Sequence, residues 1–283
     1  MKILIFCDGG FGNRMNCLLG GLLLSKMLNR KPVIIWPNND YCGASINDIY
    51  DLDYQILNIG INELFEKNIN SVFFIHTNQT KLKIRQLAVN QQNLEIIKNC
   101  LEENIIYYND MIPFFKNNEI ISMLSTLKIK KCILDKISSY CLQNNVDKNT
   151  IGIHLRRTDL GSKITDNKFV EKIIKDNLQK NVFICSDDKN TEDLFQNQFP
   201  NVLVHKKTKY VEKKNNNLEW LGKVTDDQGR THNYNVNRPR ESVLEAIIDL
   251  LILSRTSICL GLVNSTFLNI AKLYSEIDIF SNI

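Results

Sequence analysis

Short apolar runs alternate with helical stripes of hydrophobic residues along most of the chain. Residues 2–7 (KILIFC) form a continuous apolar run that ends in a glycine turn, which is typical of a buried parallel strand. Over residues 14–27, apolar side chains recur every three or four positions and predict a helix that packs on a sheet. Residues 31–36 (KPVIIW) predict the next strand. The chain therefore opens as strand, glycine turn, helix and strand.

The middle of the chain carries a weaker pattern. Apolar runs at 71–76 and 105–110 alternate with polar, Asn-rich loops, and residues 93–101 and 123–142 read as helices. The polar stretch 143–150 (QNNVDKNT) has no apolar periodicity. We therefore place a domain boundary there, with an N-terminal α/β domain at 1–149 and a C-terminal one at 150–283.

The second half has a regular rhythm of strands and helices, which is the signature of another doubly wound α/β domain. A long polar insertion at 206–238 interrupts it, and we expect this segment to be irregular, partly mobile and rich in solvated lysines. The expected strands are 150–156, 181–186, 201–206 and 257–262, and the expected helices are 167–178, 191–199, 239–256 and 266–275.

Composition supports a folded protein, since 43% of the 283 residues are hydrophobic. The formal net charge of +4 is small for this length and argues against nucleic acid as the main partner. Cysteines and the four histidines are scattered, so we expect no metal site and no required cofactor. The cysteines are expected to be reduced core residues, and they are Cys7, Cys17, Cys42, Cys100, Cys132, Cys141, Cys185 and Cys259.

Targeting signals are absent from the sequence pattern. The opening apolar run is too short for the hydrophobic part of a signal peptide, and no stretch reaches the ~20 apolar residues of a spanning helix. We expect a cytoplasmic protein, with peripheral contact to a membrane surface as an option.

Polar clusters follow four of the predicted strands, at 8–14, 154–159, 186–188 and 264–266. Ligands bind at the carboxyl ends of strands in doubly wound sheets, so we expect these clusters to converge on one cleft. The first cluster, GGFGNR, brings Gly10, Gly12, Asn13 and Arg14 to a helix start, where an anion could bind. The alternative is a tight strand-to-helix connection without a ligand.

Two adjacent arginines, Arg156 and Arg157, end the strand IGIHL. A planar guanidinium can meet a phosphate oxygen bidentately without a metal, which suits a nucleotide-diphosphate leaving group. Because neighbouring strand residues face opposite sides, one arginine should meet the ligand and the other should brace the loop. The alternative is a structural ion-pair network with Asp159 and nearby carboxylates.

The stretch IGIHLRRTD resembles the HxRR-type motif of the fucosyltransferase superfamily, which includes the α1,6-fucosyltransferases and, more distantly, the α1,2- and protein O-fucosyltransferases. GGFGNR, FICSDD, ESVLEAIIDLLILSR and NSTF resemble further pieces of that family in the same order. The resemblance implies two facing Rossmann-like α/β domains of the GT-B type, with 1–149 on the acceptor side and 150–283 binding the nucleotide-sugar donor. It also implies an inverting, metal-independent transfer of fucose from GDP-fucose to a glycan or glycolipid acceptor.

When the motif is matched residue by residue, the resemblance implies that Arg156 holds the β-phosphate and that Arg157 is also needed for transfer. His154 and Asp249 would line the guanine-nucleotide pocket, although Asp249, on a helix among apolar residues, could instead pair with a structural Arg. The donor-binding set is completed by Asp187, Asp188, Arg238, Arg240, Asn264, Ser265 and Thr266.

The catalytic base is not implied by position, because Leu160 and Gly161 follow the motif where the α1,6-fucosyltransferases have a Lys and then a Glu. Asp159 is our choice, with Asp8 and Asp40 as alternatives. No SH3-like or coiled-coil extension is evident, which suggests a catalytic core. The competing readings are the same scaffold with another GDP-sugar and a non-catalytic nucleotide- or NAD-binding protein. The NAD reading lacks a well-placed acidic residue after the second strand.

Overall fold

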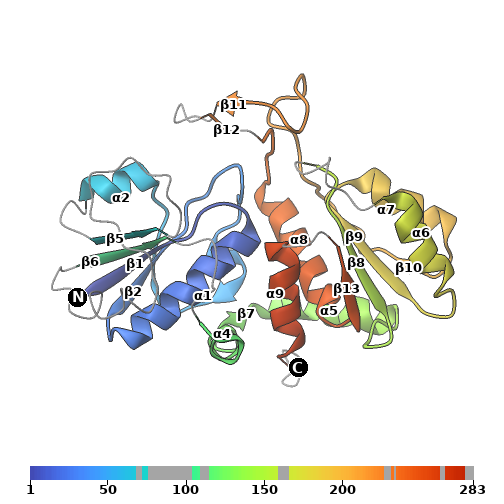
Figure 1. The fold of residues 1–283 in the computed structure, drawn as a ribbon, viewed down its shortest axis with the longest axis horizontal. Coiled ribbons are helices and arrows are strands. Elements are labelled where there is room, and N and C mark those ends of the chain that lie inside the picture. Colours follow the sequence, from blue (N-terminus) through green and yellow to red (C-terminus); the bar gives the residue numbers. More distant parts are fainter. Residues whose placement is uncertain are drawn as a thin grey trace. The chain divides into compact units, whose positions relative to one another are not determined.

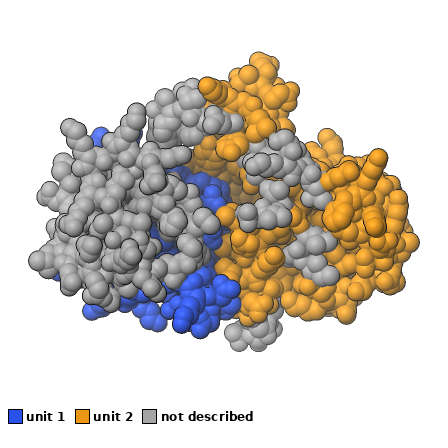
Figure 2. All heavy atoms as spheres, viewed as in Figure 1, with its two compact units in different colours: residues 1–38, 45–128 blue, residues 39–44, 129–283 orange. Residues whose placement is uncertain are grey.

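The computed structural model describes residues 1–67, 72–75, 104–108, 115–158, 166–225, 231–232, 234–261 and 265–277. These residues form an α/β protein that divides into two compact units (Figures 1 and 2). Unit 1 comprises Met1–Asn38 and Ser45–Lys128, and unit 2 comprises Asn39–Ala44 and Ile129–Ile283.

Unit 1 contains a five-stranded sheet in which all neighbouring strands are parallel. Strands β2 and β4 extend it on one side of β1, and β6 lies on the other side, so the strand order reverses at β1. Such a reversal is where open parallel sheets bind ligands. In spatial order the strands are β4 (Gln55–Leu57), β2 (Lys31–Ile35), β1 (Lys2–Phe6), β6 (Asn104–Tyr108) and β5 (Val72–Ile75).

Helix α1 (Phe11–Met27) packs closely on β1. A Cβ atom added to Gly21 would lie 2.5 Å from Cγ2 of the buried Ile5, so glycine permits this approach. Unit 1 also contains α2 (Ile61–Lys67) and α4 (Asn117–Leu124), and short elements are η1 (Ile46–Asp48), β3 (Tyr50–Asp51) and β7 (Lys128–Ile129).

Unit 2 contains a four-stranded parallel sheet whose order reverses at β8. Its core is built from alternate strand residues and from helix residues such as Phe195, all fully or almost fully buried. In spatial order the strands are β10 (Val202–Leu203), β9 (Val182–Ser186), β8 (Ile151–Leu155) and β13 (Ile258–Leu260), and the helices are α5 (Lys131–Gln143), α6 (Asn167–Lys175), α7 (Lys189–Gln198), α8 (Arg240–Leu253) and α9 (Thr266–Ser275).

The structural division differs from the expected boundary at 149/150. The single helix expected at 123–142 is two helices, α4 and α5, with β7 between them, and α5 packs on α8 of unit 2. The segment 39–44 also joins unit 2, because Gly43 N donates to Arg238 O and Arg238 N donates to Asp40 O, each at 2.9 Å. Both attachments link positions far apart in sequence.

The described part of the 206–238 insertion is irregular, as expected, except for a short antiparallel hairpin of β11 (Val224–Thr225) and β12 (Thr231–His232). The expected helix at 93–101 lies outside the described residues. Among the cysteines, Cys132 is exposed, contrary to expectation, because the first turn of α5 faces solvent there. The cysteines that are buried as free thiols are Cys7, Cys17, Cys42, Cys141 and Cys185.

Candidate active site

The loop that follows β8 is held by one carboxylate from the loop that follows β9. Asp187 Oδ1 accepts a hydrogen bond from Arg157 N, and its Oδ2 accepts one from Thr158 Oγ1, both at 2.6 Å. Two short bonds to one acid fix the backbone immediately after the strand. Asp187 therefore holds in place the loop that carries Arg156 and Arg157, which we call the arginine loop. The sequence suggested donor binding for Asp187, whereas these contacts give it a structural role.

The two arginines of this loop have different surroundings. Arg157 donates from Nη2 to Asn167 Oδ1 of α6 at 2.5 Å, which is the bracing contact expected of one of the pair. Burial lowers the pKa of Arg157 and raises that of Asp187. The positive charges of Arg156 and Arg238 oppose the rise at Asp187. Two guanidinium groups therefore lie within electrostatic reach of one carboxylate.

His154, the fourth residue of β8, is a buried and neutral imidazole. It stacks on Phe267 of α9, with ring centroids 4.7 Å apart and an interplanar angle of 24°. Its Nδ1 atom has no hydrogen-bond partner. Burial, and then the charge of Arg156, lower the pKa of His154 to about 4. An unpartnered buried nitrogen is a costly feature in a native protein and marks a place for a ligand or water hydrogen bond.

The start of α9 lies next to His154. A Cβ atom on Gly261 would lie 2.7 Å from His154 O, so the end of β13 approaches β8 closely only with glycine. Ser265 Oγ caps α9 by accepting from Leu268 N at 3.4 Å, and Thr266 is the first residue of the helix. Phe267 was not singled out from sequence, although it is the last residue of the NSTF motif.

Two of the expected donor-binding positions have clear structural contacts. Asp188 is the N-cap of α7 and accepts from Thr191 N at 2.9 Å and Thr191 Oγ1 at 2.7 Å. Arg240, at the start of α8, has a side chain that is 51% exposed and lies 3.7 Å from Glu241. Asn264 and Asp159 lie outside the described residues.

Asp249 belongs to a buried ion cluster with Lys207 and Glu192. Lys207 Nζ lies 2.6 Å from Asp249 Oδ2 and also donates to Glu192 Oε1, and at most 4% of any of the three side chains is exposed. His205 Nδ1 lies 3.1 Å from the other Asp249 oxygen. Both carboxylate oxygens of Asp249 thus have protein partners, Lys207 and His205 rather than the expected Arg, and its contact with guanine stays a prediction.

Glu192 connects this cluster to the strand ends. Its Oε1 accepts from Ser186 N at 2.6 Å, directly before Asp187, and its Oε2 accepts from Tyr210 OH at 2.5 Å. Burial, together with the charge of Asp249, raises the pKa of Glu192 to about 7. The two carboxylates raise the pKa of Lys207 despite its burial. The expectation of solvated lysines is therefore wrong for Lys207, because local sequence does not reveal distant carboxylates.

The glycine turn of unit 1 places Asp8, Gly9 and Gly10 between β1 and α1. Gly9 has φ = 82°, a left-handed conformation that favours glycine, and its N–H donates to Asp8 Oδ1 at 2.8 Å. Gly10 is the N-cap of α1 without a capping side chain. Gly12 is buried inside the helix, and Asn13 is half-buried beside Gly9.

Arg14 is completely buried and builds this turn. Its Nε donates to Gly9 O and its Nη1 to Pro37 O, both at 2.7 Å, and its guanidinium lies over the Trp36 ring at 5.1 Å. These contacts tie the turn to the end of β2. The structure therefore gives Arg14 a structural role, and its binding of the donor stays a prediction without direct support.

The structure gathers one set of predicted residues at the strand ends of unit 2. His154, the arginine loop and Asp187 lie at β8, where the strand order reverses. Within the described ranges, no group of three metal-ligating side chains could hold a metal ion. No described helix is long and apolar enough to cross a membrane.

Two parallel α/β units with polar strand ends at the reversals of strand order define a doubly wound protein of the GT-B type. Solved structures that share this fold include fucosyltransferases. NodZ alpha-1,6-fucosyltransferase co-crystallised with GDP is 14% identical over 96% of this chain and 91% of that one, with a TM-score of 0.60.

A NodZ structure soaked with GDP-fucose is 13% identical over 96% of this chain and 91% of that chain, with a TM-score of 0.58. POFUT1 in complex with GDP is 14% identical, with coverages of 96% and 93% and a TM-score of 0.52. No family model and no curated protein sequence matches the chain. The likeness to these structures confirms the fold that the resemblance implied, while the facing of the two units stays a prediction.

Replacing Lys207 by Met should lower the free energy of unfolding by about 3–5 kcal/mol, because two buried carboxylates would lose their shared cation. Lys206→Met is the matched control, since Lys206 is exposed, and its effect should stay within about 0.5 kcal/mol. Urea denaturation at neutral pH measures both. Equal stability of the two variants would show that the ion cluster does not support the fold.

His154 should make the protein less stable in mild acid. Its pKa is about 4 in the folded chain against 6.5 in an exposed histidine, so stability is complete above pH 6.5 and is lost as the pH falls toward 4. At pH 5 the loss is about 2 kcal/mol. His154→Phe keeps the ring but does not titrate, and should lose correspondingly less stability between pH 7 and pH 5. The same pH dependence in both proteins would contradict this assignment.

Proposed function

We propose that this protein is an inverting, metal-independent glycosyltransferase that transfers fucose from GDP-fucose to a glycan or glycolipid acceptor. The observation that carries the proposal is the arginine loop after β8, held by Asp187 at the reversal of strand order. The fold shared with NodZ, which has been studied with GDP and GDP-fucose, supports this donor.

Arg156 has the proposed central role. As the bond between the sugar C1 and the β-phosphate oxygen breaks, its electron pair leaves negative charge on the phosphate. A guanidinium in a fixed position can stabilise that charge with two hydrogen bonds. Arg238 adds positive charge near the same loop, and the amide groups at the start of α9 add to it.

His154 is proposed to contact the nucleotide as a neutral group. Its depressed pKa keeps it uncharged near pH 7, so one ring nitrogen can donate and the other accept. The unpartnered Nδ1 supports a ligand contact at this position.

The acceptor hydroxyl would attack C1 from the face opposite the phosphate, and its proton would pass to a carboxylate. Asp159 is our proposed base. Of the alternatives, Asp40 forms an ion pair with Lys214 at 2.7 Å, and Asp8 accepts from Gly9 N. Both stay alternatives to Asp159 for this role.

Thermal denaturation with nucleotides tests the donor. GDP and GDP-fucose should stabilise the protein by ~2.7 kcal/mol at a hundred times their dissociation constants, with or without EDTA. UDP and NAD are the controls and should give much smaller shifts. Stabilisation by NAD alone would favour the non-catalytic reading, and transfer that EDTA abolishes would refute metal independence.

Arg156→Lys should reduce turnover about a hundredfold or more while GDP affinity changes less, because lysine keeps the charge but not the bidentate geometry. Arg157→Lys is the comparison. A larger share of its effect should appear as a lower melting temperature, because Arg157 holds its loop to α6 through the hydrogen bond to Asn167. Transfer rates, GDP affinity and melting curves measure the difference. Full activity of Arg156→Lys would remove this arginine from the mechanism.

A further inference from the structure

A buried asparagine builds the loop at residues 215–222, which we call the Asn235 loop. Asn235 is fully buried, and its Nδ2 donates to Asn215 O at 2.7 Å and Leu218 O at 3.1 Å. Its Oδ1 accepts from Asn215 N at 2.8 Å, and its own N–H donates to Trp220 O at 2.9 Å. The side chain and backbone of one residue thus fix several backbone groups of the loop.

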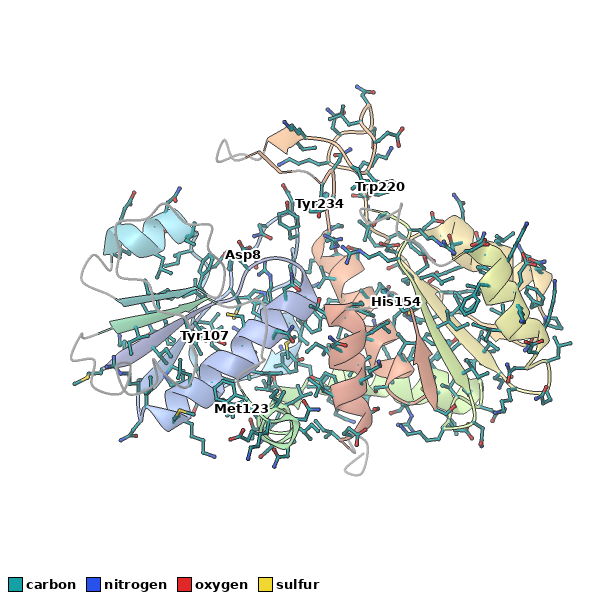
Figure 3. The ribbon with its side chains drawn as sticks, in the orientation of Figure 1. Asp8, Tyr107, Met123, His154, Trp220 and Tyr234 are labelled. Atoms are coloured by element: carbon teal, nitrogen blue, oxygen red, sulfur yellow. The ribbon has the colours of Figure 1, made fainter. Side chains whose placement is uncertain are left out.

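This ordered loop presents apolar side chains to solvent. Leu221 is 52% exposed and Leu218 is 37% exposed, and the nearby Tyr234 is 38% exposed. Trp220 and Tyr234 both lie on the segment between β10 and α8 (Figure 3). Exposed apolar groups that cluster on an ordered loop are typical of an interaction surface.

The same segment holds the excess positive charge of the protein. Residues 206–223 contain six lysines and two glutamates, a formal charge of +4 that equals the net charge of the whole chain. Lys207 is neutralised inside the ion cluster and Lys214 pairs with Asp40. Lys206 and Lys223 are exposed on either side of the loop. Lys209 pairs with Glu212, and Lys213 Nζ lies 3.8 Å from Oε2 of Glu219, whose side chain is 92% exposed between the two leucines. The exposed leucines therefore have an exposed lysine on each side in the sequence, with one carboxylate between them.

We propose that the Asn235 loop docks on an anionic lipid surface. Leucines that insert among lipid chains, with lysines at the level of the headgroups, match such a surface in both polarity and charge. A sugar would need polar partners that Leu218 and Leu221 do not provide. A second copy of the chain would need about 800 Å² of complementary surface, far more than three side chains supply. Docking here is independent of the donor chemistry proposed above.

Flotation with lipid vesicles tests this inference. The wild-type protein should bind vesicles of phosphatidylcholine with phosphatidylglycerol, and binding should weaken as salt is raised. The double variant Leu218→Ser/Leu221→Ser should bind about tenfold less or weaker still, because both inserted side chains are lost. Leu142→Ser/Leu178→Ser is the matched control, since these leucines are 81% and 57% exposed elsewhere in unit 2, and it should bind like the wild type.

Three results would overturn the inference. The first is a wild-type protein that does not float with anionic vesicles, and the second is a Leu218→Ser/Leu221→Ser variant that binds as tightly as the control. The third is a concentration-dependent dimer of the wild type that this variant abolishes, which would assign the loop to self-association. Melting curves of all variants, and GDP affinity measured without vesicles, separate a docking defect from misfolding or a failed donor assignment.

Discussion

The ion cluster of Glu192, Lys207 and Asp249 is the interaction on which the strand ends of unit 2 depend. Charges buried this deeply are stable only when each has partners, and Lys207 meets both carboxylates. Glu192 also accepts from Ser186 N, so the cluster fixes the end of β9 where Asp187 begins. Asp187 in turn holds the arginine loop. A chain of direct contacts thus connects the buried charges with the proposed phosphate site.

This cluster carries one more carboxylate than cation. Burial and the neighbouring Asp249 therefore raise the pKa of Glu192 to about 7, while Lys207 stays protonated because two acids surround it. His205, beside Asp249 and 3.7 Å from Glu245, adds a second carboxylate of α8 to the network. The polar base of the 206–238 insertion is consequently attached to the α/β core, while its Asn235 loop presents apolar groups to solvent.

Several residues expected to contact a donor instead build the framework around it. Arg14 binds two carbonyl groups of its own unit, and Asp188 caps α7. An arginine or an aspartate can contact a ligand or the protein backbone equally well, because its guanidinium or carboxylate forms the same kinds of hydrogen bond with either. His154 differs, since one of its buried nitrogens has no partner in the protein. That difference makes His154 the stronger candidate for ligand contact.

The sequence by itself determined most strands of the two large sheets, though not β4, together with most helices and the arginine loop. The spacing of apolar residues indicates which face of each segment is buried. The polar residues that follow a strand lie at its end simply because the chain is continuous. Only the tertiary structure decided that α5 belongs to unit 2, that Lys207 is buried and that Asn235 organises a loop. Lys207 meets Glu192 and Asp249 across 15 and 42 residues. Which residues become partners over such distances depends on how the helices and strands pack. A local sequence pattern therefore does not show which charged or amide side chains will be buried.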